Sequence, residues 1–139
     1  MTVMGIDLGD TRTGVAFSDP TGLLAGQPQV IVEKDRARLI ERLVSLIREK
    51  GVQEVALGLP RNMDGTQGER ALLARQLGEE LERRAGVPVE LWDERRTTVD
   101  AHRILSENGR RGKKRKNTVD AVAATLILQG YLDFRRNQR

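Results

Sequence analysis

Short apolar, strand-like runs alternate with amphipathic helical segments along the chain, and this order restricts the possible folds more than any other feature. Three strand-like runs separated by Gly-containing turn clusters come first, at residues 3–8, 15–17 and 29–33. Two more such runs follow, at residues 54–59 and 87–92. Helical spacing of apolar residues marks four other segments, at residues 36–50, 69–85, 99–107 and 119–134.

This order predicts an α/β fold. The first three strands are close enough in sequence to form an antiparallel meander, whereas strands separated by a helix must be added in parallel. We therefore expect a mixed five-stranded sheet with helices on both faces. A chain of 139 residues fits one ordinary domain, so we expect a single domain over residues 1–139.

The residue types that are missing limit the possible chemistry. The sequence has no cysteine, and its one histidine is His102, which excludes thiol catalysis and cysteine- or histidine-rich zinc sites. Any bound metal would be held by oxygen atoms. The first residues lack a basic region followed by an apolar stretch of signal-peptide length, so we expect a cytoplasmic, soluble protein without a membrane segment.

Charge is distributed unevenly along the chain. Residues 1–109 carry 15 basic and 18 acidic side chains, a net charge of −3, whereas residues 110–139 carry 9 basic and 2 acidic side chains, a net charge of +7. A concentrated positive segment suits a polyanionic partner such as nucleic acid, because Lys and Arg displace counterions from phosphates. The alternative is a solvated charged tail.

Three acidic positions fall where α/β sheets usually bind ligands, beyond the carboxyl ends of strands. Asp7 ends the first strand, Asp93 and Glu94 directly follow the fifth, and Asp120 is expected in the first turn of the last helix. Converging carboxylates repel one another unless a cation compensates them. Oxygen ligands favour Mg²⁺ or Mn²⁺, and a pair of such ions is a common device for cleaving phosphodiesters.

Each acidic position also has a structural interpretation. Asp7 could open the turn at Gly9, Asp93 and Glu94 could begin a loop, and Asp120 could complete a helix cap with Asn117. Adjacent strand residues point to opposite faces, so Asp93 and Glu94 are not expected to enter the same pocket together.

Other segments offer contacts to phosphate. The glycine loop at residues 7–14 resembles the first phosphate loop of actin-like and sugar-kinase ATPases, but those enzymes bind nucleotide between two domains, so no nucleotide cofactor is expected. Arg61 and Asn62 lie in a polar loop after the fourth strand. The aromatic residues look too few and too scattered for a stacking platform. A basic loop precedes the last helix and contains Arg110, Arg111, Lys113, Lys114, Arg115 and Lys116.

Four motifs together resemble the YqgF family, whose members are described as pre-16S rRNA nucleases and as Holliday-junction-resolvase-like proteins. The resemblance covers nearly the whole chain and implies a ribonuclease H-like fold. It also implies a two-metal nuclease site at Asp7, Glu94 and Asp120, with Arg12 and Arg95 near the substrate phosphate. The motifs are Gly5–Gly9 with Arg12–Ala16, Gly58–Gly65, Asp93–Thr98 and Val119–Ala124.

The sequence thus predicts a Mg²⁺- or Mn²⁺-dependent nuclease that processes the ends of pre-16S rRNA in ribosome biogenesis and can act as a monomer. Three alternatives stay open. They are a Holliday junction resolvase acting on DNA, a non-catalytic nucleic-acid-binding factor, and a small ATPase-like module that uses the Gly9 loop.

Overall fold

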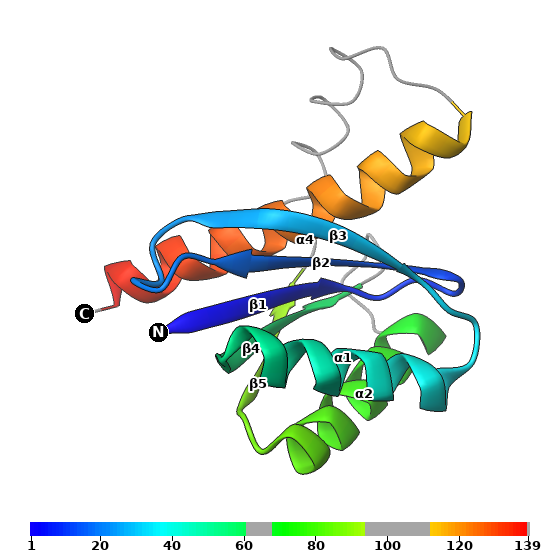
Figure 1. Ribbon diagram of the computed structural model, residues 1–139, viewed down its shortest axis with the longest axis horizontal. Coiled ribbons are helices and arrows are strands. Elements are labelled where there is room, and N and C mark those ends of the chain that lie inside the picture. The colour runs from blue at the N-terminus through cyan, green and yellow to red at the C-terminus, as the bar shows by residue number, and fades with distance from the viewer. Residues whose placement is uncertain (61–67, 94–111, 139) are drawn as a thin grey trace.

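One five-stranded sheet with helices on both faces forms the described part of the protein (Figure 1). The computed structural model describes residues 1–60, 68–93 and 112–138, with the backbone alone for residues 112–120. The strands are β1 (Thr2–Asp7), β2 (Arg12–Ser18), β3 (Ala25–Val32), β4 (Val52–Leu59) and β5 (Val89–Asp93). The helices are α1 (Arg36–Lys50), α2 (Glu69–Ala85) and α4 (Gly112–Asn137).

The strand order is β3-β2-β1-β4-β5, which confirms the predicted mixed sheet. β1, β2 and β3 pair antiparallel as a meander, while β4 pairs parallel to β1 and β5 parallel to β4. Both parallel additions come after a helix, as a parallel connection requires. β1 is therefore the central strand, and the carboxyl ends of β1, β4 and β5 lie at the same edge.

The two helices between strands begin and end as their sequences predict. Asp35 caps α1, since its carboxylate accepts a hydrogen bond from the backbone N–H of Arg38 at 3.0 Å. Gly51 and Gly86 end α1 and α2 in the left-handed region, with φ of 65° and 72°.

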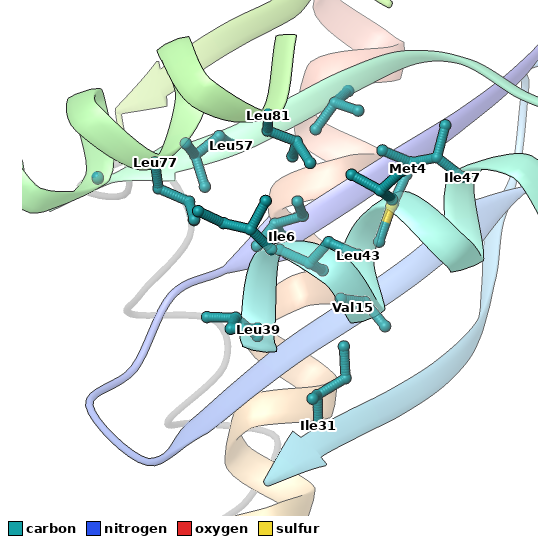
Figure 2. Close-up of a cluster of buried hydrophobic side chains, with 14 of the residues drawn as sticks. Met4, Ile6, Val15, Ile31, Leu39, Leu43, Ile47, Leu57, Leu77 and Leu81 are labelled. Carbon is teal, nitrogen blue, oxygen red and sulfur yellow. The ribbon is translucent and has the colours of Figure 1, made fainter. Parts of the chain in front are cut away.

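Strand alternation divides the apolar side chains between two cores. Met4, Ile6 and Leu57 face α1 and α2, where they pack against Leu43 and Leu77 (Figure 2). On the opposite face a smaller core packs under α4, formed by Val3, Ala16, Ala56, Trp92, Ala124, Ile127, Leu128, Tyr131 and Leu132. Both cores are closed by a helix, so the faces of residues 36–50 and of the last helix are used in the fold, as the sequence predicts.

The helix α4 contacts β1 very closely at Gly5. A Cβ atom at this position would lie 2.6 Å from the Cβ of Leu128 and 3.0 Å from the carbonyl oxygen of Ala124. Only glycine permits this approach. The helix therefore lies at a position on the sheet that a side chain at Gly5 would forbid.

Three predicted boundaries are clearly wrong. β2 begins at Arg12, three residues earlier than predicted. β3 begins at Ala25, four residues earlier than predicted, and accommodates Pro28 because it is an edge strand. α4 begins at Gly112, so residues 112–117 are helical rather than a loop, and Asp120 lies well inside the helix instead of in its first turn. Lys and Arg are good helix formers, and this favours helix in the basic segment. The predicted helix at 99–107 lies outside the described residues.

None of the helices in the described ranges combines the length and the apolar content that a membrane span requires.

We expect Gly5→Ala to destabilise the protein by about 1–3 kcal/mol, because the added methyl group overpacks the contact with α4. Urea unfolding measures this change. Gly26→Ala in β3 is the matched control, since a Cβ atom there meets nothing within 4 Å and should change stability by less than about 0.5 kcal/mol. Equal stability of the two variants would contradict the close approach.

Candidate active site

Asp7 lies at the carboxyl end of the central strand, on the face of the sheet that carries α4. Val3 belongs to the core under α4, Gly5 touches this helix, and alternation along β1 places Asp7 on the same face. The side chain of Asp7 is partly buried. Of the candidate carboxylates, it is the one whose side chain the structure describes on this face.

Glycines flank Asp7 on both sides in the sheet. Gly14 of β2 is its direct partner across the antiparallel pair. On the other side, Ile6 is in register with Leu57 of β4, so the next position opposite Asp7 is Gly58. Neither neighbour has a side chain, and glycine in a strand is typical of places where another molecule approaches the backbone closely.

Asp93 ends β5 and lies on the other face of the sheet. Trp92 belongs to the core under α4, whereas Leu91 packs against the core under α1 and α2. Alternation therefore places Asp93 on the side of Leu91, away from the face of Asp7. Glu94, the next residue, lies outside the described residues.

Asp120 belongs to α4, one helical turn before Ala124. Ala124, Ile127 and Tyr131 follow Asp120 at helical spacing, and these three side chains are buried. The side chain of Asp120 itself is not described. Within the described residues no cluster of three or more potential metal-ligating side chains occurs. The side chains of Glu94 and Asp120, two of the three predicted ligands, are not among those described.

The turn between β1 and β2 is fixed by contacts on several sides. A Cβ atom at Gly9 would lie 2.0 Å from the carbonyl oxygen of Arg12, so the turn requires glycine at this position. The N–H of Glu33 donates to the carbonyl oxygen of Thr11 at 2.8 Å, and exposed Asp10 and Arg70 form an ion pair at 3.6 Å. The segment next to Asp7 is thus held between the end of β3 and the first turn of α2.

Most of the predicted phosphate contacts cannot be placed. Arg12 begins β2, two residues from Gly14 on the same side of the strand, and so lies on the face of Asp7. The others lie outside the described residues or have undescribed side chains: Arg61, Asn62, Arg95, Arg110, Arg111, Lys113, Lys114, Arg115 and Lys116.

Sequence reasoning missed a cluster that anchors α4 on the sheet. Three of the four aromatic residues are not scattered: Trp92 contacts Tyr131 edge-on with ring centroids 6.0 Å apart and Phe134 at 5.6 Å, whereas Phe17 lies in the other core. Beside them, Arg135 forms an ion pair with Glu54 of β4. Tyr131 and Phe134 share one helix face, but no local signal links them to Trp92, which comes from an edge strand.

Burial raises the pKa of Tyr131 to about 12, and the negative charge of Glu54 acts in the same direction. The neutral phenol is therefore the form that the folded state favours. Its contribution to stability is present below pH 10, the ordinary value, and is lost as the pH rises towards 12.

A ribonuclease H-like fold is the class of structure that this sheet defines. Two solved structures cover nearly the whole chain: the Thermus thermophilus RuvC in complex with a Holliday junction has a TM-score of 0.64 at 18% identity over 99% of this chain and 96% of that one. The fowlpox virus resolvase has a TM-score of 0.60 at 11% identity over 97% and 99% of the two chains. At these identities the likeness shows the fold.

The family follows from sequence. The RuvX family model, described as a Holliday junction resolvase, matches residues 1–134. A protein of Halothermothrix orenii named "Putative pre-16S rRNA nuclease" is 44% identical over 134 residues, 96% of each chain. One of the same name from Lachnospira eligens is 42% identical over 98% of this chain and 99% of its own. The chain belongs to this family, as its motifs predict, and is a nuclease.

The raised pKa of Tyr131 can be measured directly, because it is the only tyrosine of the chain. We expect the ultraviolet absorbance of tyrosinate to appear with a midpoint near pH 12 in the folded protein and near 10 in denaturant. Glu54→Gln should lower the midpoint, since it removes a neighbouring negative charge. A midpoint of about 10 with an unchanged circular dichroism spectrum would contradict the anchoring of α4 described above.

Proposed function

We propose that the protein is a divalent-metal nuclease that processes the ends of pre-16S rRNA, with Asp7, Glu94 and Asp120 as its catalytic carboxylates. The observation that carries this proposal is the position of Asp7 at the end of the central strand, between two glycines and under α4. The proposed unit is one nuclease domain over residues 1–139, and this substrate implies work in the cytoplasm.

The register between β1 and α4 supports the inclusion of Asp120. Arg135 and Leu132 lie near Met1 and Val3 at one end of the strand, while Leu128 and Ala124 lie on Gly5. The helix α4 therefore runs antiparallel to β1. From Gly5 to Asp7 the strand advances by about 7 Å, and from Ala124 to Asp120 the helix advances by about 6 Å. Both steps go in the same direction, towards the carboxyl end of β1.

Strand alternation supports Glu94 in preference to Asp93. Trp92 faces α4 and Asp93 faces the other way. If the alternation continues for one residue, Glu94 would lie on the face of Asp7, and we propose this position for it. Asp93 would then serve to end the strand.

The donor set suits a hard divalent cation. Three carboxylates on one face would repel one another, and oxygen ligands are those that Mg²⁺ and Mn²⁺ prefer. Asp7, Glu94 and Asp120 would hold the ions, of which we propose two. Bound there, divalent ions would activate water and stabilise the charge that develops in phosphodiester hydrolysis.

Basic side chains are proposed to hold the substrate by its phosphates. Arg12 lies on the face of Asp7, and Arg61, Asn62 and Arg95 follow strands whose carboxyl ends share its edge. The segment Arg110–Lys116 precedes Asp120 in the chain. Its charge would supply affinity for nucleic acid of any sequence, since phosphate contacts carry no sequence information.

RNA is proposed as the substrate in preference to a DNA junction, because the edge strand β3 does not favour formation of a dimer with two active sites. A four-way junction is two-fold symmetric, so paired cutting requires two active sites on a stable dimer. β3, an edge strand, is interrupted by Gln27 with φ of 50° and by Pro28, which lacks a backbone N–H. Such features oppose edge-to-edge pairing of strands. We therefore propose that a monomer is active.

Removal of any one carboxylate charge should abolish metal-dependent cleavage. We expect Asp7→Asn, Glu94→Gln and Asp120→Asn each to reduce the rate by at least about a thousandfold and to leave the fold intact, because charge repulsion falls. Cleavage of a labelled precursor-like RNA measures this effect. Asp10→Asn, an exposed carboxylate in the adjoining turn, is the control that should stay active.

Full activity of Asp7→Asn would refute the site. Wild-type protein that binds RNA but cleaves no substrate with either metal would favour the non-catalytic binding factor instead.

The choice of substrate predicts a difference between two labelled nucleic acids. Dilute protein with Mn²⁺ should cleave a precursor-like RNA and should not introduce symmetric nicks into a synthetic four-way DNA junction. Sedimentation at the assay concentration should show a monomer. Symmetric nicking of the junction without cleavage of RNA would restore the resolvase hypothesis.

A further inference from the structure

A hollow of about 240 Å³ lies at the end of the molecule opposite to Asp7. Figure 1 shows that the first residues of β1, the end of α4 and the connection between β2 and β3 meet here. Val3 and Leu132, both buried, form the floor, with Met1 and Leu23 at the side. Thr21, Gly22, Arg135 and Arg136 complete the lining.

The connection that carries Leu23 is built around Asp19. Its carboxylate accepts hydrogen bonds from the backbone N–H groups of Leu23 at 2.9 Å and Leu24 at 3.1 Å, and from the hydroxyl of Thr21. These bonds, that from Thr21 first, lower the pKa of Asp19 to about 2. The loop is therefore shaped by its own contacts over residues 19–24.

The side chain of Gln129 fixes the same loop to α4. Its carbonyl oxygen accepts from the N–H of Ala25 at 2.8 Å, and its amide nitrogen donates to the carbonyl oxygen of Leu23 at 3.0 Å. The backbone nitrogen of Met1 donates to the carbonyl oxygen of Pro20. Three parts of the chain thus hold one short loop in a fixed conformation.

This fixed loop exposes two leucines to water. Leu23 is 44% exposed and Leu24 is 67% exposed, although both are large apolar side chains. An ordered backbone that holds adjacent apolar side chains outside the core, beside a surface hollow, is typical of a surface that packs against another protein. Protein–nucleic acid interfaces are by contrast polar and rich in basic side chains.

The charges around the hollow indicate what kind of protein segment fits. The nearby carboxylates are engaged: Glu54 pairs with Arg135, Asp133 pairs with Arg136 at 3.3 Å, and Asp19 accepts backbone N–H groups. The ion pair of Arg136 is exposed, and exposed pairs contribute little, so its guanidinium can exchange partners at low cost. An incoming carboxylate would therefore find a cationic group at the rim of the hollow.

We propose that this surface, formed by Leu23, Leu24, Arg136 and the hollow floored by Val3 and Leu132, docks a segment of a partner protein. The segment carries one large apolar side chain that enters the hollow, next to one or more acidic residues that pair with Arg136. The volume of the hollow is smaller than that of pockets for small-molecule ligands, which is about 300–1,000 Å³. This difference favours a single side chain as the occupant.

The surface is separate from the nuclease site. The six residues of β1, Thr2–Asp7, span about 20 Å, so a bound segment leaves the carboxylates accessible. The proposal does not depend on which nucleic acid is cleaved, and its failure leaves the nuclease assignment untouched.

An array of short immobilised peptides tests the proposal with the full chain. One set has a central Leu, Phe, Trp or Met flanked by Asp and Glu; matched sets replace the apolar residue by Ser or the acidic residues by Lys. We expect binding to peptides of the first set alone. Leu23→Ser and Arg136→Glu should each weaken it about tenfold or more. Leu72→Ser, which replaces an exposed leucine on α2, is the matched control and should bind as the wild type does.

Three results would overturn the proposal. The first is no preference for apolar–acidic peptides, or a preference that Leu23→Ser leaves unchanged. The second is a concentration-dependent dimer in sedimentation that Leu23→Ser dissociates, which would assign the surface to a second copy of the chain. The third is a tenfold loss of affinity for labelled single-stranded RNA in Leu23→Ser. RNA cleavage and thermal unfolding of these variants should match the wild type.

Discussion

The close approach of α4 to the central strand at Gly5 is the contact on which the arrangement of the candidate site depends. It sets the height of the helix above the sheet and its register along β1. The aromatic contacts of Trp92 and the ion pair of Arg135 with Glu54 hold the same helix farther along. A larger residue at Gly5 would displace the helix that carries Asp120 relative to the strand that carries Asp7. The absence of a side chain at Gly5 therefore couples the stability of the small core to the geometry proposed for catalysis.

The two faces of the sheet have different tasks. The face under α1 and α2 is covered by large aliphatic side chains and supplies most of the core (Figure 2). The face under α4 carries small residues at Gly5, Gly14 and Gly58, and Asp7 follows at the strand end. A larger residue at Gly5 could not be accommodated on this face without displacing the helix. The same strand thus contributes to a well-packed core and to the site proposed to bind a phosphate backbone.

How much the sequence predicts depends on how local the signal is. The caps Asp35, Gly51 and Gly86 and the periodicity of α1 and α2 are local, and those helices were predicted with their observed bounds. The early start of β3 was missed because Pro28 normally opposes a strand, and its position at an edge is a property of the whole sheet. Asp7 could be selected from its place after an apolar run. The contacts among Trp92, Tyr131 and Phe134 could not be predicted from the sequence, since they depend on how α4 crosses the sheet. The positions of Glu94 and the side chain of Asp120 stay predictions.

The central claim is that Asp7, Glu94 and Asp120 share divalent cations on the face of the sheet under α4. Anomalous diffraction from crystals grown with Mn²⁺ tests it most directly, because it locates the metal independently of activity. The account predicts anomalous density in direct contact with the carboxylate of Asp7 and with carboxylates of Glu94 and Asp120, and loss of that density in Asp7→Asn. Density bound on the opposite face, at Asp93, or at sites that exclude Asp7 would contradict it.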